Sequence, residues 1–205
     1  MIASIKIPTK LSEINLKQYR DYVLLDEKDE RKYLLQVINI FANGDLEHVE
    51  KFSINKLRKP LQKLLSLLNN ETNKFEAIID VDGIEYGFHP QLNELTVGEM
   101  ADLEKFIELG LWENMHKILA VLYRRVVSKY SNLYQIEQYN GVERTADLFL
   151  AKFPVNYLHG ALVFFLTIER EFILHTKIYS KQETTSKPSK QVPKQRGGGI
   201  TLSKP

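Results

Sequence analysis

The amino-acid sequence predicts an α+β fold that is mainly helical. Over most of the chain, apolar residues recur at intervals of three and four, which is typical of amphipathic helices. Residues 75–88 and 133–139 instead alternate between apolar and polar, which is typical of strands. We therefore expect about seven helices and a small antiparallel sheet, built on a β-hairpin at residues 75–88 plus one strand at residues 133–139.

Three helices are expected before the hairpin. The apolar spacing predicts helices over residues 11–25 and 29–42, and Asn43-Gly44 has the residue types that commonly end a helix. Ser12 is placed to cap the first of these helices. The third is expected over residues 60–68, since proline in the first turn of a helix removes no hydrogen bond that the helix would make.

The dipeptide Asp82-Gly83 separates the two alternating segments, residues 75–81 and 84–88. Glycine readily adopts the positive φ that a tight two-residue turn requires, so this pattern predicts a hairpin. The run Asp80-Val-Asp82-Gly83 also has some likeness to a calcium loop. That loop needs further oxygen ligands and a glutamate at its twelfth position, where this sequence continues as a strand, so we expect no calcium site.

The segment Thr96-Val-Gly-Glu99 is a capping box, in which the first and fourth residues satisfy each other's backbone amides at a helix start. Gly110 is expected to end the helix that begins there. Four helices are expected in this half of the chain, over residues 96–108, 112–127, 142–152 and 155–179.

The chain divides into a globular domain, residues 1–180, and a basic flexible C-terminal arm, residues 181–205. The arm is rich in Ser, Thr, Lys, Gln, Pro and Gly, and such a segment buries too little surface to offset its ordering entropy. It contains six basic residues and one acidic residue and so carries +5, whereas residues 1–180 contain 22 basic and 25 acidic residues and carry −3.

No catalytic, cofactor-binding or metal-binding constellation is expected. The chain has no cysteine, which excludes disulfides and thiolate chemistry. Glu113 and His116 have the spacing of di-iron ligands in helix bundles, but the second such pair that those sites need is missing. His159, beside Gly160 in an apolar segment, is interpreted as a packed histidine rather than a catalytic one.

No membrane association is expected. The most apolar stretch, residues 157–168, has about 12 residues, against the roughly 20 that span a bilayer. It is interpreted as a buried core helix. The first eight residues do not have the composition of a signal peptide.

Two basic regions could bind partners. Arg124-Arg125, Lys129 and Arg144 could form a patch for nucleic acid, but the net charge of the body is negative, so core or half-buried positions are the simpler interpretation. The arm is the better candidate, because its spaced cations precede three glycines and a short β-prone peptide. Its alternative role is that of an unstructured solubilising tail. The residues expected to make partner contacts are Lys190, Lys194, Arg196, Ile200 and Leu202.

Several core and cap motifs resemble those of small proteins from the structural and tail gene modules of tailed bacteriophages, including crAss-like phages. The motifs are the hairpin end and helix start at residues 86–104, Ala-Val-Leu-Tyr-Arg at 120–124, the Tyr-x-Ile-Glu-x-Tyr segment at 134–139, and Ala-Leu-x-Phe-Phe at 161–165. The likeness covers residues 75–170 and includes no catalytic residue.

This resemblance implies a non-enzymatic structural protein of the virion, held in or near the portal or tail through its C-terminal arm. The implied partners are other virion proteins (portal, tail or tape-measure) and further copies of the chain as a homo-oligomer. The implied location is the virion, with the host cytoplasm during assembly. One alternative is a tail-assembly chaperone that binds the tape-measure protein. Another is a nucleic-acid-binding accessory protein that uses the basic tail.

Overall fold

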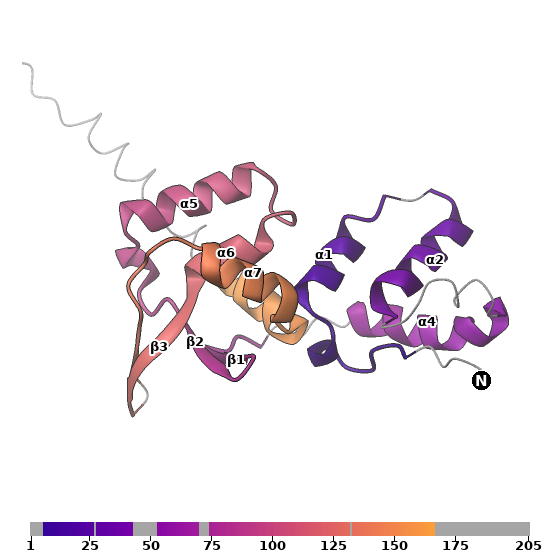
Figure 1. The fold of residues 1–205 in the computed structure, drawn as a ribbon, viewed down its shortest axis with the longest axis horizontal. Helices are drawn as coiled ribbons and strands as arrows, with labels where there is room; N and C mark the ends of the chain where they lie inside the picture. Colours follow the sequence, from indigo (N-terminus) through magenta and orange to yellow (C-terminus); the bar gives the residue numbers. More distant parts are fainter. Residues whose placement is uncertain (1–5, 27, 43–52, 70–73, 132, 167–205) are drawn as a thin grey trace, which may run out of the picture. The chain divides into compact units, whose positions relative to one another are not determined.

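The computed structural model describes residues 6–26, 28–42, 53–69, 74–131 and 133–166. Within these residues the fold is α+β and mainly helical, with one antiparallel sheet, which confirms the predicted fold class (Figure 1). The α-helices are α1 (Leu16–Val23), α2 (Glu30–Phe41), α4 (Ile54–Leu68), α5 (Val97–Glu108), α6 (Met115–Leu122) and α7 (Glu143–Lys152), and residues 158–166 are also helical. Short 3₁₀ helices occupy Leu11–Glu13, Leu92–Glu94 and Val155–Tyr157.

The first helices begin at different residues from those predicted. The helix expected over residues 11–25 starts only at α1, because Asn15 and Gln18 form a capping box in place of a cap at Ser12. The helix expected from residue 60 starts at Ile54, so Pro60 lies inside α4. The helix continues through this proline with one face buried: Leu57, Leu61, Leu64 and Leu68 are all core residues.

The sheet has the strand order β1-β2-β3-β4, and every neighbouring pair is antiparallel. Its strands are β1 (Ile78–Val81), β2 (Ile84–Phe88), β3 (Tyr123–Tyr130) and β4 (Leu133–Ile136). The predicted hairpin is confirmed, and its turn residues Asp82 and Gly83 both have positive φ, 56° and 78°. The Asp80 carboxylate accepts a hydrogen bond from the Gly83 amide at 3.1 Å, so this aspartate supports the turn.

The prediction of one helix over residues 112–127 is wrong. Helix α6 ends at Leu122, and β3 begins at the next residue. Tyr123 pairs with Phe88 of β2, and Val126 pairs with Ile136 of β4, so β3 joins the hairpin to the last strand. Tertiary pairing on both sides therefore overrides the helical spacing, and the β-branched Val126 and Val127 are well suited to a strand.

One continuous core joins the helices to the sheet. Phe88, Tyr123, Phe149 and Phe153 are fully buried, and their rings meet edge to face. Backbone hydrogen bonds also connect α1 to the C-terminal helices: the Leu16 amide donates to the Phe153 carbonyl at 3.0 Å.

Gly160 marks the closest approach between backbones. A Cβ at this position would lie 2.2 Å from the Lys74 carbonyl oxygen, a contact that requires the backbone to move. We predict that Gly160→Ala lowers the free energy of unfolding by about 1–3 kcal/mol, the usual cost of overpacking. Urea denaturation followed by circular dichroism measures this change.

The matched control is Gly98→Ala in α5, where a Cβ meets nothing within 4 Å. This substitution should leave stability unchanged or raise it by up to about 1 kcal/mol, because alanine favours a helix more than glycine does. Equal stabilities of the two variants would contradict the close contact at Gly160.

Candidate functional site

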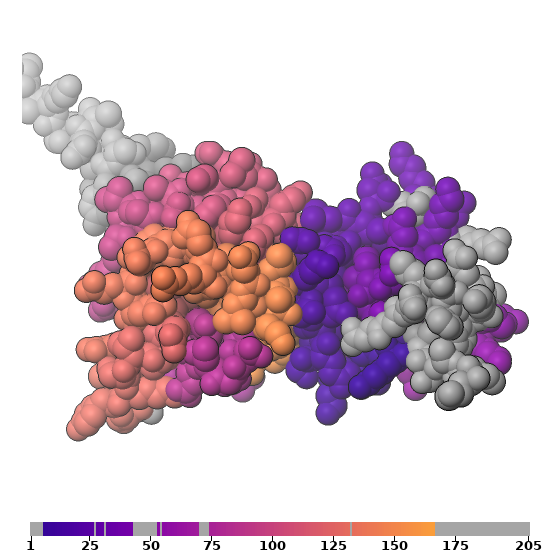
Figure 2. Space-filling view, viewed as in Figure 1, coloured from indigo at the N-terminus to yellow at the C-terminus, as the bar shows by residue number. Residues whose placement is uncertain are grey.

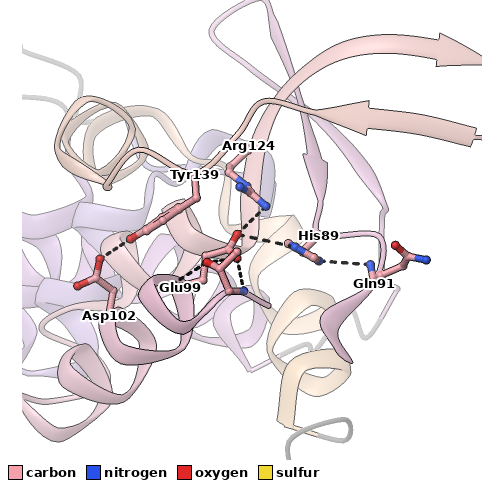
Figure 3. Close-up of polar contacts among 7 residues, drawn as sticks. His89, Gln91, Glu99, Asp102, Arg124 and Tyr139 are labelled. Atoms are coloured by element: carbon pink, nitrogen blue, oxygen red, sulfur yellow. Dashed lines mark hydrogen bonds and ion pairs between the residues drawn. The ribbon is translucent and has the colours of Figure 1, made fainter. Parts of the chain in front are cut away.

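The described residues contain a polar cluster around the buried Glu99 and Arg124, which Figure 3 shows. We call it the Glu99 cluster, and its members come from four parts of the fold. They are His89 after β2, Thr96 as the N-cap of α5, Glu99 and Asp102 within α5, Arg124 in β3, and Tyr139 after β4.

Glu99 is at the centre of the cluster and is 1% exposed. Its Oε2 atom accepts hydrogen bonds from the Thr96 amide at 2.6 Å and the Thr96 hydroxyl at 2.7 Å. The Glu99 amide in turn donates to the Thr96 hydroxyl oxygen at 3.3 Å, which completes the predicted capping box. The negative charge also lies at the helix N-terminus, where the helix dipole is favourable.

Arg124 brings the opposite charge. Its Nη2 atom lies 2.7 Å from Glu99 Oε1, and the arginine side chain is only 9% exposed. The two groups form an ion pair by distance, although no guanidinium N–H is aligned for a hydrogen bond to Oε1. The guanidinium carbon is also 5.8 Å from the centre of the Tyr139 ring, within range of a cation–π interaction.

His89 lies on the same side of Glu99 as Arg124 (Figure 3). Its Nδ1 accepts a hydrogen bond from the Gln91 amide at 3.3 Å, so the neutral ring carries its proton on Nε2. Nε2 is 3.8 Å from Glu99 Oε1. Burial lowers the pKa of His89, and the nearby Arg124 charge lowers it further, so the ring is neutral at pH 7.

Tyr139 completes the cluster by donating a hydrogen bond from its hydroxyl to Asp102 Oδ2. Burial raises the pKa of Tyr139, and the bond to the Asp102 carboxylate raises it further. The phenol is therefore protonated and acts as a donor. This bond joins the segment after β4 to α5.

The members of the Glu99 cluster bind one another, and together they attach α5 to the sheet. None of them lines the two grooves beside α4. One groove, of about 490 Å³, lies between α2 and α4. The other, of about 450 Å³, lies between α4 and residues 7–9. Within the described ranges, no group of three or more His, Asp or Glu side chains is arranged to hold a metal ion.

The residues predicted to contact partners, Lys190, Lys194, Arg196, Ile200 and Leu202, lie outside the described residues. Of the basic patch considered on the body, Arg125 and Arg144 are exposed, whereas Arg124 and Lys129 are paired with glutamates. Arg124 is buried against Glu99, and Lys129 Nζ is 2.5 Å from Glu85 Oε1.

The histidines considered as candidates are in packed positions. His116 is buried, and burial lowers its pKa. The His159 ring meets the Tyr19 ring edge to face, and its Nε2 is 3.0 Å from the Tyr19 hydroxyl oxygen. The pairing of Arg124 with Glu99 was not predicted, because the hydrophobic spacing predicted a helix over residues 112–127 that would include Arg124. The one available signal was the capping box, which identifies Glu99 alone.

No protein-family model, curated protein or solved structure matches this chain. Among the helices that the structure describes, none combines the length and the apolar character needed to cross a bilayer.

Removing the positive charge of this buried ion pair should lower the free energy of unfolding more than removing the positive charge of an exposed pair. Arg124→Met leaves Glu99 buried without its counter-charge, so it should lower the free energy of unfolding by about 3–5 kcal/mol. Lys129→Met breaks the exposed pair with Glu85 and should cost less than about 1 kcal/mol. Urea denaturation of both variants tests the difference.

The double variant Glu99→Gln/Arg124→Met should lose less stability than the sum of the two single variants, because neither charge is then left alone. Glutamine also keeps the capping oxygen. Additive losses, or equal effects of Arg124→Met and Lys129→Met, would contradict the role of the pair.

The free energy of unfolding should also depend on pH. The pKa of His89 and that of His116 are lower in the folded state than in the unfolded state, so the unfolded state binds more protons as the pH falls below about 6.5. The free energy of unfolding should therefore fall between pH 7 and pH 5. Chemical denaturation at both pH values should show a smaller fall for His89→Gln than for the unmodified chain. A fall of unchanged size would contradict the assignment to His89.

Proposed function

We propose that this chain is a non-enzymatic structural protein of a tailed-phage virion, held in or near the portal or tail through residues 181–205. The observation that carries the proposal is how the polar side chains of the Glu99 cluster are used. Glu99, Arg124, Tyr139 and Asp102 bind one another and hold helices to the sheet. Polar side chains that bind one another and connect helices to a sheet support the role of a structural subunit. The motif resemblance to phage structural modules supports the same role.

The distribution of charge supports attachment through the arm. Residues 181–205 carry +5 and residues 1–180 carry −3, so the arm of one copy is attracted to the body of another. Lys190, Lys194 and Arg196 would supply this attraction. Ile200 and Leu202, which follow three glycines, would supply apolar contacts to the neighbouring subunit.

One observation favours a second candidate, a tail-assembly chaperone for the tape-measure protein. The groove between α2 and α4 is lined by Leu34, Leu61 and Leu65, with Glu30 and Arg58 also among its lining residues. An apolar floor with charged groups is suited to the apolar face of an amphipathic helix. A chaperone would leave before the particle is complete.

Mass spectrometry of purified particles separates these functions, and variants of the arm make the test specific. We predict that the chain is present in finished particles, and that Ile200→Asp/Leu202→Asp lowers its amount by about tenfold or more, because charges disfavour an apolar contact. Thr201→Asp is the matched control and should have a smaller effect if residues 200 and 202 share one face.

Absence of the chain from finished particles, together with its presence in assembly intermediates, would favour the chaperone. A loss caused only by Lys190→Ala/Lys194→Ala/Arg196→Ala would favour the nucleic-acid-binding function, if it comes with DNA binding that weakens steeply between low and moderate salt. Unchanged incorporation of all arm variants would contradict attachment through the arm.

A further inference from the structure

Strand β4 is an edge of the sheet. It pairs with β3 on one side, and in the order β1-β2-β3-β4 no strand follows it. Within the described part of the chain, no backbone group outside the β3 side is hydrogen-bonded to β4. Its other edge therefore presents backbone donors and acceptors to which a further strand can be added.

The β3–β4 hairpin extends beyond the rest of the sheet. β3 pairs with β2 only at Tyr123, Arg124 and Arg125, and a bulge follows between Val126 and Ser128. The remaining residues of β3 pair with β4 alone, so the hairpin continues past β2 (Figure 1), and its tip projects from the molecular surface (Figure 2).

The projecting part carries exposed apolar side chains beside the polar Ser128, Lys129 and Gln135. Tyr130 and Leu133 form the last cross-strand pair, and they are 84% and 74% exposed. Val127, at the bulge, is also exposed. Aromatic and aliphatic side chains exposed together on a hairpin tip are suited to burial against a partner.

The two edge strands of the sheet, β1 and β4, differ in how well they are protected against the addition of another strand. Proteins usually protect a free edge with charged residues or proline. β1 carries Asp80 and is followed by Asp82, and both residues are exposed. β4, Leu133-Tyr-Gln-Ile136, contains neither a charged residue nor a proline, although the half-buried Glu137 follows it. The β4 edge is therefore the less protected of the two.

Two features bear on which strand this edge takes. β4 is only four residues long, which suits a short guest such as Ile200-Thr-Leu202. A second β4 edge would bring together two bodies that each carry −3, whereas the arm carries +5. The length of β4 is compatible with either guest, and charge favours the arm over a second β4.

We propose that Ile200–Leu202 of a neighbouring copy adds to the outer edge of β4 as a fifth strand of the sheet. This inference rests on the proposed function, in which the arm joins one subunit to the next. Backbone hydrogen bonds to β4 hold the guest, and an Ile200 or Leu202 side chain lies beside Leu133. The three preceding glycines let the arm reach the edge from another subunit.

Disulfide trapping tests this contact sharply, because the chain has no cysteine and every disulfide must involve introduced residues. A chain with Gln135→Cys, which replaces an exposed residue on the same face of β4 as Leu133, is mixed with a chain of different mass carrying Leu202→Cys. The control mixture carries Ser66→Cys, on an exposed position of α4, in place of Gln135→Cys.

After mild oxidation, the Gln135→Cys mixture should contain about tenfold more disulfide-linked heterodimer than the Ser66→Cys mixture, because docking raises the effective concentration of the two thiols. Adding Ile200→Asp to the Leu202→Cys chain should remove the excess. Two results from these mixtures would overturn the proposal: equal amounts of heterodimer in both, or Gln135→Cys homodimers as the main product. A third variant carries both cysteines in one chain. If it forms only the disulfide within a single chain, the proposed contact between copies is also overturned.

The trapping experiment and the particle experiment can fail separately. If the disulfide forms at β4 but the arm variants are still incorporated into particles as well as the unmodified chain is, the contact stands and the proposed function is rejected. Loss of incorporation without trapping would retain the function and place the arm on another surface.

Discussion

Glu99 and Arg124 are buried together, and neither charge is stable in the interior without the other. An ion removed from water loses several kcal/mol of hydration, which only a well-placed counter-charge offsets. Glu99 is held by its capping box at the start of α5, and Arg124 is the second residue of β3. The ion pair at 2.7 Å therefore sets where α5 lies on the sheet, and His89 and Tyr139 enclose it.

Features that depend on near neighbours in the chain could be predicted from the sequence. Thr96 and Glu99 predicted a helix start, and Asp82-Gly83 predicted a turn whose positive φ values the structure contains. The hydrophobic periodicity was sufficient for the fold class. In each case the residues that determine the structure are within about four positions of one another, so a local pattern contains the needed information.

Features decided by distant residues could not be predicted in this way. Residues 123–127 have helical spacing, but pairing with β2 and β4 places them in a strand. That error also concealed the site, because Arg124 was grouped with Arg125 and Lys129 as a surface patch. In the structure the strand buries Arg124 against Glu99, 25 positions earlier in the chain. A buried ion pair between distant residues leaves no periodic signal in the sequence.

The body and the arm have separate roles in what we propose: the buried ion pair connects α5 to the sheet, and the β4 edge is the proposed binding site of the arm. Hydrogen–deuterium exchange of the free chain and of the assembled particle compares both parts directly. We predict that assembly slows exchange at the amides of β4 and of residues 200–202, while the amides of Glu99 and Arg124 exchange slowly in both states. Equal exchange at β4 in the two states would contradict the account.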